Sequence, residues 1–117
     1  MLEELRQSAM TNNHILALSA LMKVVGNETR LRMLFVLWRS GELCVCDLSD
    51  IFGITQPAVS RHLKILREKA LVQTRRDAQT IYYSIFSESP FAEMLIQTFE
   101  QQELAGITLN IASDVRN

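Results

Sequence analysis

Residues 53–68 read GITQPAVSRHLKILRE and predict the centre of the fold, a tight turn followed by a helix. Gly53 ends the segment before it, Thr55 is a favourable N-cap, and Pro57 falls where the first helical turn tolerates proline. Apolar residues then recur at helical spacing on one side, at Val59, Leu63 and Leu66. We therefore expect a helix from this cap to about residue 70, with its apolar side buried.

The opposite side of this helix is polar and basic. An α-helix fits the major groove of DNA, where the edges of the four base pairs differ. Four residues on this side have side chains suited to base edges: Gln56, Ser60, Arg61 and His62. Four basic residues are suited to phosphates: Lys64, Arg67, and Arg75 and Arg76 at the tip of a following hairpin. The sequence thus predicts a helix that reads DNA.

The flanking segments complete a recognisable order of elements. We expect helices over 13–25, over 28–39 after an Asn27 cap, and a short one over about 46–52. Strands over 71–75 and 80–86, joined by a polar turn at 77–79, make the hairpin, and an amphipathic helix follows over 91–103. This order predicts a mainly α fold with a β-hairpin wing, a single winged helix-turn-helix domain over residues 1–117 with its DNA-binding core at 27–86.

Charge is distributed unevenly along the chain. The 117 residues are 48% hydrophobic and 21% charged, the balance of one folded domain, and their net charge is −1. Between residues 56 and 76, six Lys or Arg side chains oppose only Glu68, a local charge of +5. On charge alone a solvated helix face, or a helical bundle with one basic face, explains this equally well. The order of helix, turn, helix and hairpin favours DNA binding.

The chain shows no sign of export or membrane insertion. No apolar run approaches the roughly 20 residues that span a bilayer, and the N-terminus lacks a basic stretch followed by an apolar one. We therefore expect a cytoplasmic protein with no membrane partner. In that compartment the two cysteines, Cys44 and Cys46, are reduced thiols.

Three segments together resemble the ArsR/SmtB family of metalloid- and metal-sensing repressors. They are NETRLR at 27–32, GELCVCDL at 41–48 and QPAVSRHL at 56–63, and the resemblance spans roughly residues 14–100. It implies a non-enzymatic homodimer that binds an imperfect inverted repeat of double-stranded DNA without a cofactor and dissociates when an inducer binds. It also implies that helices 13–25 and 91–104 form the dimer interface, with residues 1–12 as an arm and 105–117 as a tail.

The cysteine pair is the candidate inducer site. Two buried thiols that act as small hydrophobes are the simpler interpretation of an isolated Cys-x-Cys. Within the motif that resembles arsenic and cadmium/lead sensors, we expect Cys44 and Cys46 to bind a thiophilic ion. In a regular helix, positions i and i+2 lie about 200° apart, so binding one ion by both sulfurs should distort the start of the short helix. The turn at Gly53 would pass that distortion to the reading helix.

The identity of the inducer follows from which further ligands are present. The resemblance to the arsenic branch places Ser49 where a third cysteine often stands, so Ser49, a water or a small-molecule thiol would complete the shell. The N-terminal arm has none of the cysteines of cadmium/lead sensors, and His14 is the nearest substitute. The C-terminal helix also lacks the histidines of zinc sensors. We therefore expect arsenite or antimonite as inducer.

Three alternatives remain open at this point. A cadmium-, lead- or zinc-responsive repressor of the same fold is the first, and a thiol-redox repressor that responds to oxidants or persulfides is the second. An enzyme with Cys44 as nucleophile is the third. It is disfavoured because Asp47 raises rather than lowers the pKa of a neighbouring thiol, and because His14 and His62 are the only histidines.

Overall fold

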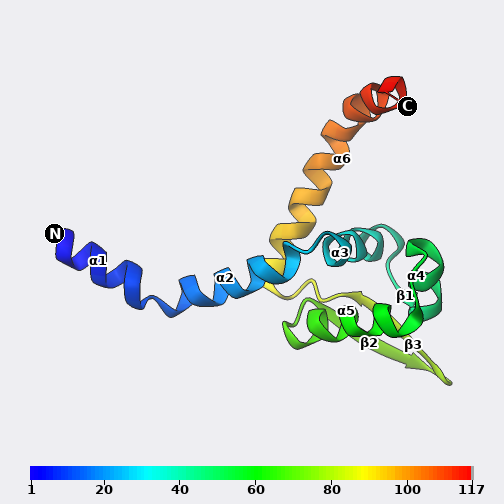
Figure 1. The fold of residues 1–117 in the computed structure, drawn as a ribbon, viewed down its shortest axis with the longest axis horizontal. Coiled ribbons are helices and arrows are strands. Elements are labelled where there is room, and N and C mark those ends of the chain that lie inside the picture. Colours follow the sequence, from blue (N-terminus) through cyan, green and yellow to red (C-terminus); the bar gives the residue numbers. More distant parts are fainter. Residues whose placement is uncertain (117) are drawn as a thin grey trace.

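A computed structural model describes residues 1–116 of the chain, with side chains described for residues 1–103. The elements follow the predicted order (Figure 1), with the bounds α1 Leu2–Thr11, α2 Asn13–Val25, α3 Glu28–Ser40, β1 Leu43–Cys44, α4 Val45–Phe52, α5 Gln56–Glu68, β2 Val72–Asp77, β3 Thr80–Ile85 and α6 Pro90–Arg116. The mainly α fold with a β-hairpin wing is confirmed. Helix α4 begins at Val45, one residue earlier than expected, and α5 ends at Glu68 rather than near residue 70.

The helix-turn-helix is held by a shared apolar core and a tight turn. Side chains from α3, α4 and α5 are at most 1% exposed: Met33, Leu34, Leu37, Leu48, Val59, Leu63 and Leu66. Gly53 has φ +64°, the left-handed conformation that glycine adopts without strain, and it ends α4. The hydroxyl of Thr55 accepts a hydrogen bond from the Ala58 N–H at 3.3 Å and caps α5. The turn therefore forms where residues 53–55 predicted it.

The wing belongs to a three-stranded antiparallel sheet of order β1-β3-β2. Strand β1 was not predicted from the sequence; its two residues pair with β3, so that Cys44 lies opposite Tyr82. The prediction that Arg75 and Arg76 lie at the hairpin tip is wrong. Both lie within β2, and the tip is formed by residues 78–79. The left-handed φ of +55° at residue 78 closes the turn two residues later than the charge pattern suggested.

The terminal helices extend away from this core as two arms (Figure 1). The N-terminal arm forms the helix α1, and its apolar side chains, Leu2, Leu5 and Met10, are exposed. Helix α6 continues to Arg116 instead of ending at 103, so the backbone of residues 105–116 is helical. Near the start of α6, Phe99 packs edge-on against Phe35 of α3, with ring centroids 5.5 Å apart. None of the described helices is long and apolar enough to cross a membrane.

The buried side of α5 should control the stability of the domain. We expect Leu63→Ala to lower the free energy of unfolding by about 2–5 kcal/mol, because Leu63 is 0% exposed and its removal leaves a cavity. Urea unfolding at one fixed protein concentration measures this. The control Glu68→Ala, at an exposed position of the same helix, should stay within about 0.5 kcal/mol of wild type. Equal unfolding midpoints for the two variants would contradict the packing described.

Candidate DNA-binding face and thiol site

One side of α5 is exposed and carries most of the residues expected to contact DNA. Gln56, Ser60, Arg61, Lys64 and Arg67 are all exposed, opposite the buried apolar side of the helix. On the wing, Arg76 is exposed as well. These six side chains are therefore open to solvent and to a polyanion, and both the reading helix and the wing carry exposed positive charge.

His62 lies differently from its neighbours. It is half-buried, and its Nδ1 lies 3.4 Å from a guanidinium nitrogen of Arg30 in α3. Burial lowers the pKa of His62, and the positive charges of Arg30 and Arg61 lower it further. A neutral imidazole that accepts from Arg30 at Nδ1 carries its proton on Nε2. The ring of His62 thus contacts α3 through Arg30, and the expected contact of His62 with bases stays a prediction.

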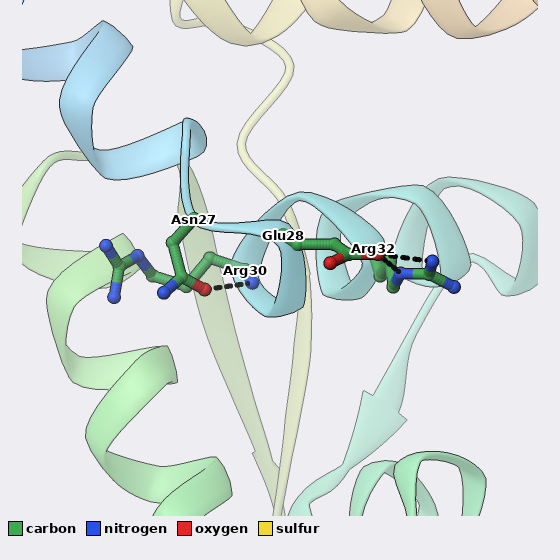
Figure 2. Close-up of polar contacts among 4 residues, drawn as sticks. All are labelled: Asn27, Glu28, Arg30 and Arg32. Atoms are coloured by element: carbon green, nitrogen blue, oxygen red, sulfur yellow. Dashed lines mark hydrogen bonds and ion pairs between the residues drawn. The ribbon is translucent and has the colours of Figure 1, made fainter.

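Arg30 is itself held in place at the start of α3. Figure 2 shows the Asn27 side chain, which accepts a hydrogen bond from the Arg30 backbone N–H at 3.1 Å and caps the helix. The Arg30 Nε donates to the carbonyl of Val24 at 2.8 Å. The same guanidinium therefore joins the end of α2 to His62 on the reading helix. Asn27 was predicted as a cap, but the sequence pattern gave no signal for this contact of Arg30, whose partners lie 6 and 32 residues away.

Arg75 forms an ion pair on the wing. Its guanidinium donates to both carboxylate oxygens of Glu42, at 2.6 and 3.2 Å, and lies 4.9 Å from the centre of the Tyr82 ring. The hydrogen bond from Arg75 lowers the pKa of Glu42. Both side chains are substantially exposed, so this pair contributes little to stability. Glu42 nevertheless balances the charge of Arg75, which leaves Arg76 as the stronger candidate for a phosphate.

The two cysteines occupy the junction between the sheet and α4. Cys44 is the last residue of β1 and also the N-cap of α4, with an extended backbone at φ −92° and ψ 171°. Cys46 is exposed in the first turn of α4. Because Cys44 is not helical, the opposed directions of positions i and i+2 in a helix do not apply to this pair. Both cysteines line one open cleft of about 420 Å³.

The walls of this cleft come from the reading helix and the wing. The residues that line it besides the cysteines are Val45, Ser60, Gln79, Thr80, Ile81 and Tyr83. A ligand at the thiols is therefore in contact range of α5, of Gln79 in the hairpin turn and of β3. The sequence predicted the thiols at the start of the short helix before the reading helix, but not beside the wing, because the pairing of β1 with β3 has no local signal.

Asp47 controls the chemistry of Cys44. The carboxylate of Asp47 accepts the Cys44 backbone N–H at 3.2 Å, and the Asp47 backbone N–H faces the Cys44 sulfur, a reciprocal cap. That N–H has the largest single influence on the thiol and lowers its pKa. Burial and the Asp47 carboxylate together outweigh it, so the pKa of Cys44 is raised overall. Cys44 is accordingly a protonated thiol at neutral pH.

Two contacts link the short helix to the reading helix. The side-chain amide of Gln56 donates to the Cys46 sulfur at 3.4 Å, so a residue expected to meet bases also contacts the thiol site. The hydroxyl of Ser49 is half-buried and donates to the Ile54 carbonyl at 2.5 Å, inside the turn before α5. Ser49 thus stabilises the turn. His14 is exposed on α2 and lines a separate groove with α6 residues.

Sequence comparison identifies the relatives of the chain. Residues 27–74 match the model of the bacterial regulatory proteins of the arsR family. The arsenical resistance operon repressor of Escherichia coli is 35% identical over 96 residues, 79% of this chain and 82% of that protein. ArsR1 of Pseudomonas putida, an arsenic resistance transcriptional regulator, is 41% identical over 76 residues, 65% of this chain but only 59% of its own length. A cadmium resistance regulator of Staphylococcus aureus, a CadC homolog, is 31% identical over 86 residues, 73% of this chain and 70% of that protein.

Comparison of structures gives the same result. Reduced HlyU from Vibrio cholerae superposes with a TM-score of 0.68 at 34% identity, over 80% of this chain and 95% of that one. The identity to the Escherichia coli repressor, over most of both chains, is enough to assign the family. Together with the winged helix-turn-helix and its exposed basic side, these similarities show that the chain belongs to the arsR family of bacterial regulatory proteins, a DNA-binding transcriptional regulator rather than an enzyme.

Proposed function

We propose that the chain is a homodimeric repressor that leaves its operator when trivalent arsenic or antimony binds Cys44 and Cys46. The observation that carries this proposal is the shared cleft, which is lined by both cysteines, by Ser60 of the reading helix and by the wing. An inducer bound there touches both elements that hold DNA. Relatives named for arsenic resistance and for cadmium resistance both occur, so the choice of ion rests on the chemistry of this site.

The DNA-binding half of the proposal assigns distinct roles to the exposed side chains. Gln56, Ser60 and Arg61, near the start of α5, reach base edges in the major groove, and Lys64, Arg67 and Arg76 contact phosphates. Arg75, paired with Glu42, contributes a weaker phosphate contact. His62 positions the reading helix against Arg30.

A homodimer accounts for the exposed apolar side chains of α2 and α6. Several apolar side chains of α2 are exposed, among them Ile15, Leu16, Leu18 and Met22. A groove between α2 and α6 is lined by Leu18, Leu21, Phe91 and Met94. Exposed apolar surface of this extent is typical of an interface between subunits. Two copies related by a two-fold axis would present two reading helices to an inverted repeat of double-stranded DNA.

Inducer binding acts on both DNA-contacting elements through the contacts of the thiols. An ion on the Cys46 sulfur removes the acceptor of the Gln56 amide at the start of α5. An ion on the Cys44 sulfur competes with the Asp47 N–H that caps α4 and disturbs the residue that pairs with Tyr82. A coupling free energy of about 1–3 kcal/mol between the two sites weakens DNA binding roughly 5–150-fold.

The raised pKa of Cys44 favours arsenite over a divalent cation. Cadmium must displace the thiol proton before it binds sulfur, which costs affinity at neutral pH. Arsenous acid, As(OH)₃, is neutral, and each thiol proton leaves with an As–OH group as water. Cadmium, lead or zinc sensing and thiol oxidation remain the competing functions, and the experiments below separate them.

Substitutions at Arg61 and Arg76 should separate base reading from phosphate contact. With a duplex selected from a random-sequence pool, we expect Arg61→Ala to cost about 1–3 kcal/mol and to relax preference at one position of each half-site. We expect Arg76→Ala to weaken binding to all sequences. It should also reduce the slope of log affinity against log salt concentration by about 1, the effect of losing one phosphate contact. Fluorescence anisotropy over a range of salt concentrations measures both. Identical losses on selected and unselected DNA for both variants would refute this division of roles.

Substitution of the cysteines should remove induction and preserve DNA binding. Serine is a strong N-cap, so Cys44→Ser keeps the cap of α4, and we expect it and Cys46→Ser to bind operator like wild type. We expect arsenite and antimonite to release wild type and neither variant. The matched control Ser49→Ala should still respond, because Ser49 bonds Ile54 in the turn. Release by peroxide or polysulfide but not by arsenite would instead establish a redox repressor.

The effect of pH should distinguish the two classes of inducer. Each protonated thiol that binds cadmium releases its proton, so with both Cys44 and Cys46 as ligands the affinity for cadmium should rise about a hundredfold per pH unit at neutral pH and below. Arsenite binding releases water and no proton, so its affinity should stay nearly constant between about pH 6 and 7.5. Titration calorimetry in buffers of different ionisation enthalpy measures the proton count. A lower releasing concentration for cadmium than for arsenite at neutral pH would overturn the assignment of the ion.

A further inference from the structure

We infer that the cleft beside Cys44 and Cys46 holds the organic substituent of a monosubstituted trivalent arsenical or antimonial. Such a compound carries one carbon–metalloid bond and two exchangeable oxygen ligands. The inference rests on the proposed function, since it names the inducer of the same thiol site.

The number of protein ligands is the first argument. A trivalent centre forms three bonds, and this chain has two cysteines. Ser49, the neighbouring oxygen on α4, donates its hydroxyl to Ile54 within the turn. Among the described residues, no group of three His, Cys, Asp or Glu side chains is placed to hold an ion. Two protein bonds and one external substituent therefore satisfy the metalloid.

The space beside the thiols is the second argument. The cleft of about 420 Å³ lies within the size range of small-molecule sites and is bounded by Ile81 and Tyr83 on the wing and by Val45 on α4. Ile81 and Tyr83 are half-buried, so part of their apolar surface remains accessible to a ligand in the cleft. An apolar group bonded to the metalloid would gain free energy by burial there, whereas a hydroxyl would not.

The bond changes balance without a redox partner. Two As–OH bonds of R–As(OH)₂ break and two As–S bonds form, each thiol proton leaving with a hydroxide as water. The As–C bond is retained, and arsenic stays trivalent.

The position of the substituent gives it a direct route to DNA release. Ser60 on the reading helix and Thr80 at the start of β3 both line the cleft, together with the two cysteines at the junction of β1 and α4. A bulky group in this space would push the wing away from α5. The spacing of base-reading and phosphate-binding side chains would then no longer match one face of the DNA.

Four probes test the inference: phenylarsonous acid, methylarsonous acid, arsenite alone, and arsenite with glutathione. Binding is measured by calorimetry on the full chain without DNA, and release is measured on the selected duplex. We expect the phenyl compound to bind and to release DNA at about tenfold lower concentration than arsenite alone, because its ring is buried. Methylarsonous acid should fall between the two.

Variants of the wing test whether the cleft causes the preference for the phenyl compound. Ile81→Trp fills the cleft. We expect it to weaken the binding of phenylarsonous acid about tenfold more than the binding of methylarsonous acid. Gln79→Trp, at an exposed position of the turn that lines the same cleft, should act in the same direction and tests the idea if Ile81→Trp fails to fold. Gln73→Trp is the matched control, since it adds the same bulk to an exposed position of β2 outside the cleft.

The outcomes separate this inference from the proposed function. Equal potency of arsenite alone and the phenyl compound would overturn the inference and leave an arsenic-responsive repressor. Arsenite that requires glutathione and then matches the phenyl compound would overturn it too, because a thiolate rather than carbon would fill the third position. Release by cadmium and by none of the arsenicals would overturn the proposed function itself.

Discussion

The placement of Cys44 is the constraint on which the rest of the molecule depends. This one residue ends β1, pairs with Tyr82 in the wing and caps the helix that supports the reading helix. Its N–H is held by Asp47, and its sulfur faces the N–H of Asp47 in return. The sheet and the helix-turn-helix therefore meet at a single position, and that position carries a thiol. A change at the sulfur cannot act on one element alone.

The positive charge of the molecule is concentrated on the reading helix and the wing. The chain is acidic overall, yet the exposed side of α5 and residue 76 of the wing are basic. Glu42, at the edge of β1, pairs with Arg75 and so links the segment just before Cys44 to the hairpin. This exposed pair contributes little to stability, but it fixes which wing arginine is left for phosphates.

The features that the sequence predicted are those encoded by neighbouring residues. The cap at Thr55, the left-handed Gly53 and the apolar spacing of α5 are local, and each appears where its residues indicated. The missed features are contacts between distant segments. A strand of two residues has no periodicity to detect, so β1 was overlooked, and with it the contact of the thiols with the wing.

The same limit explains the site residues whose surroundings differed from expectation. An outward position on a helical wheel does not reveal a neighbouring helix, so His62 was assigned to DNA although Arg30 lies against it. Gln56 was assigned to bases, but the turn folds it back onto a sulfur ten residues earlier. The choice of Cys44 and Cys46 came from a motif, and the structure adds the cleft that they share.

The energetics indicate how a switch at this position must work. Sulfur is a weak acceptor, so losing the cap of α4 alone costs at most about 1 kcal/mol. A 100-fold loss of DNA affinity needs about 2.7 kcal/mol. The remainder must come from the other contacts of the two cysteines, the Gln56 hydrogen bond at the start of α5 and the pairing of Cys44 with Tyr82 in the sheet. Under the proposed function, that pairing connects the thiol site directly to the wing, so displacement of the hairpin supplies part of this remainder. A ligand that enters the space between the thiols and the hairpin is therefore better placed to induce release than one that only occupies the sulfurs.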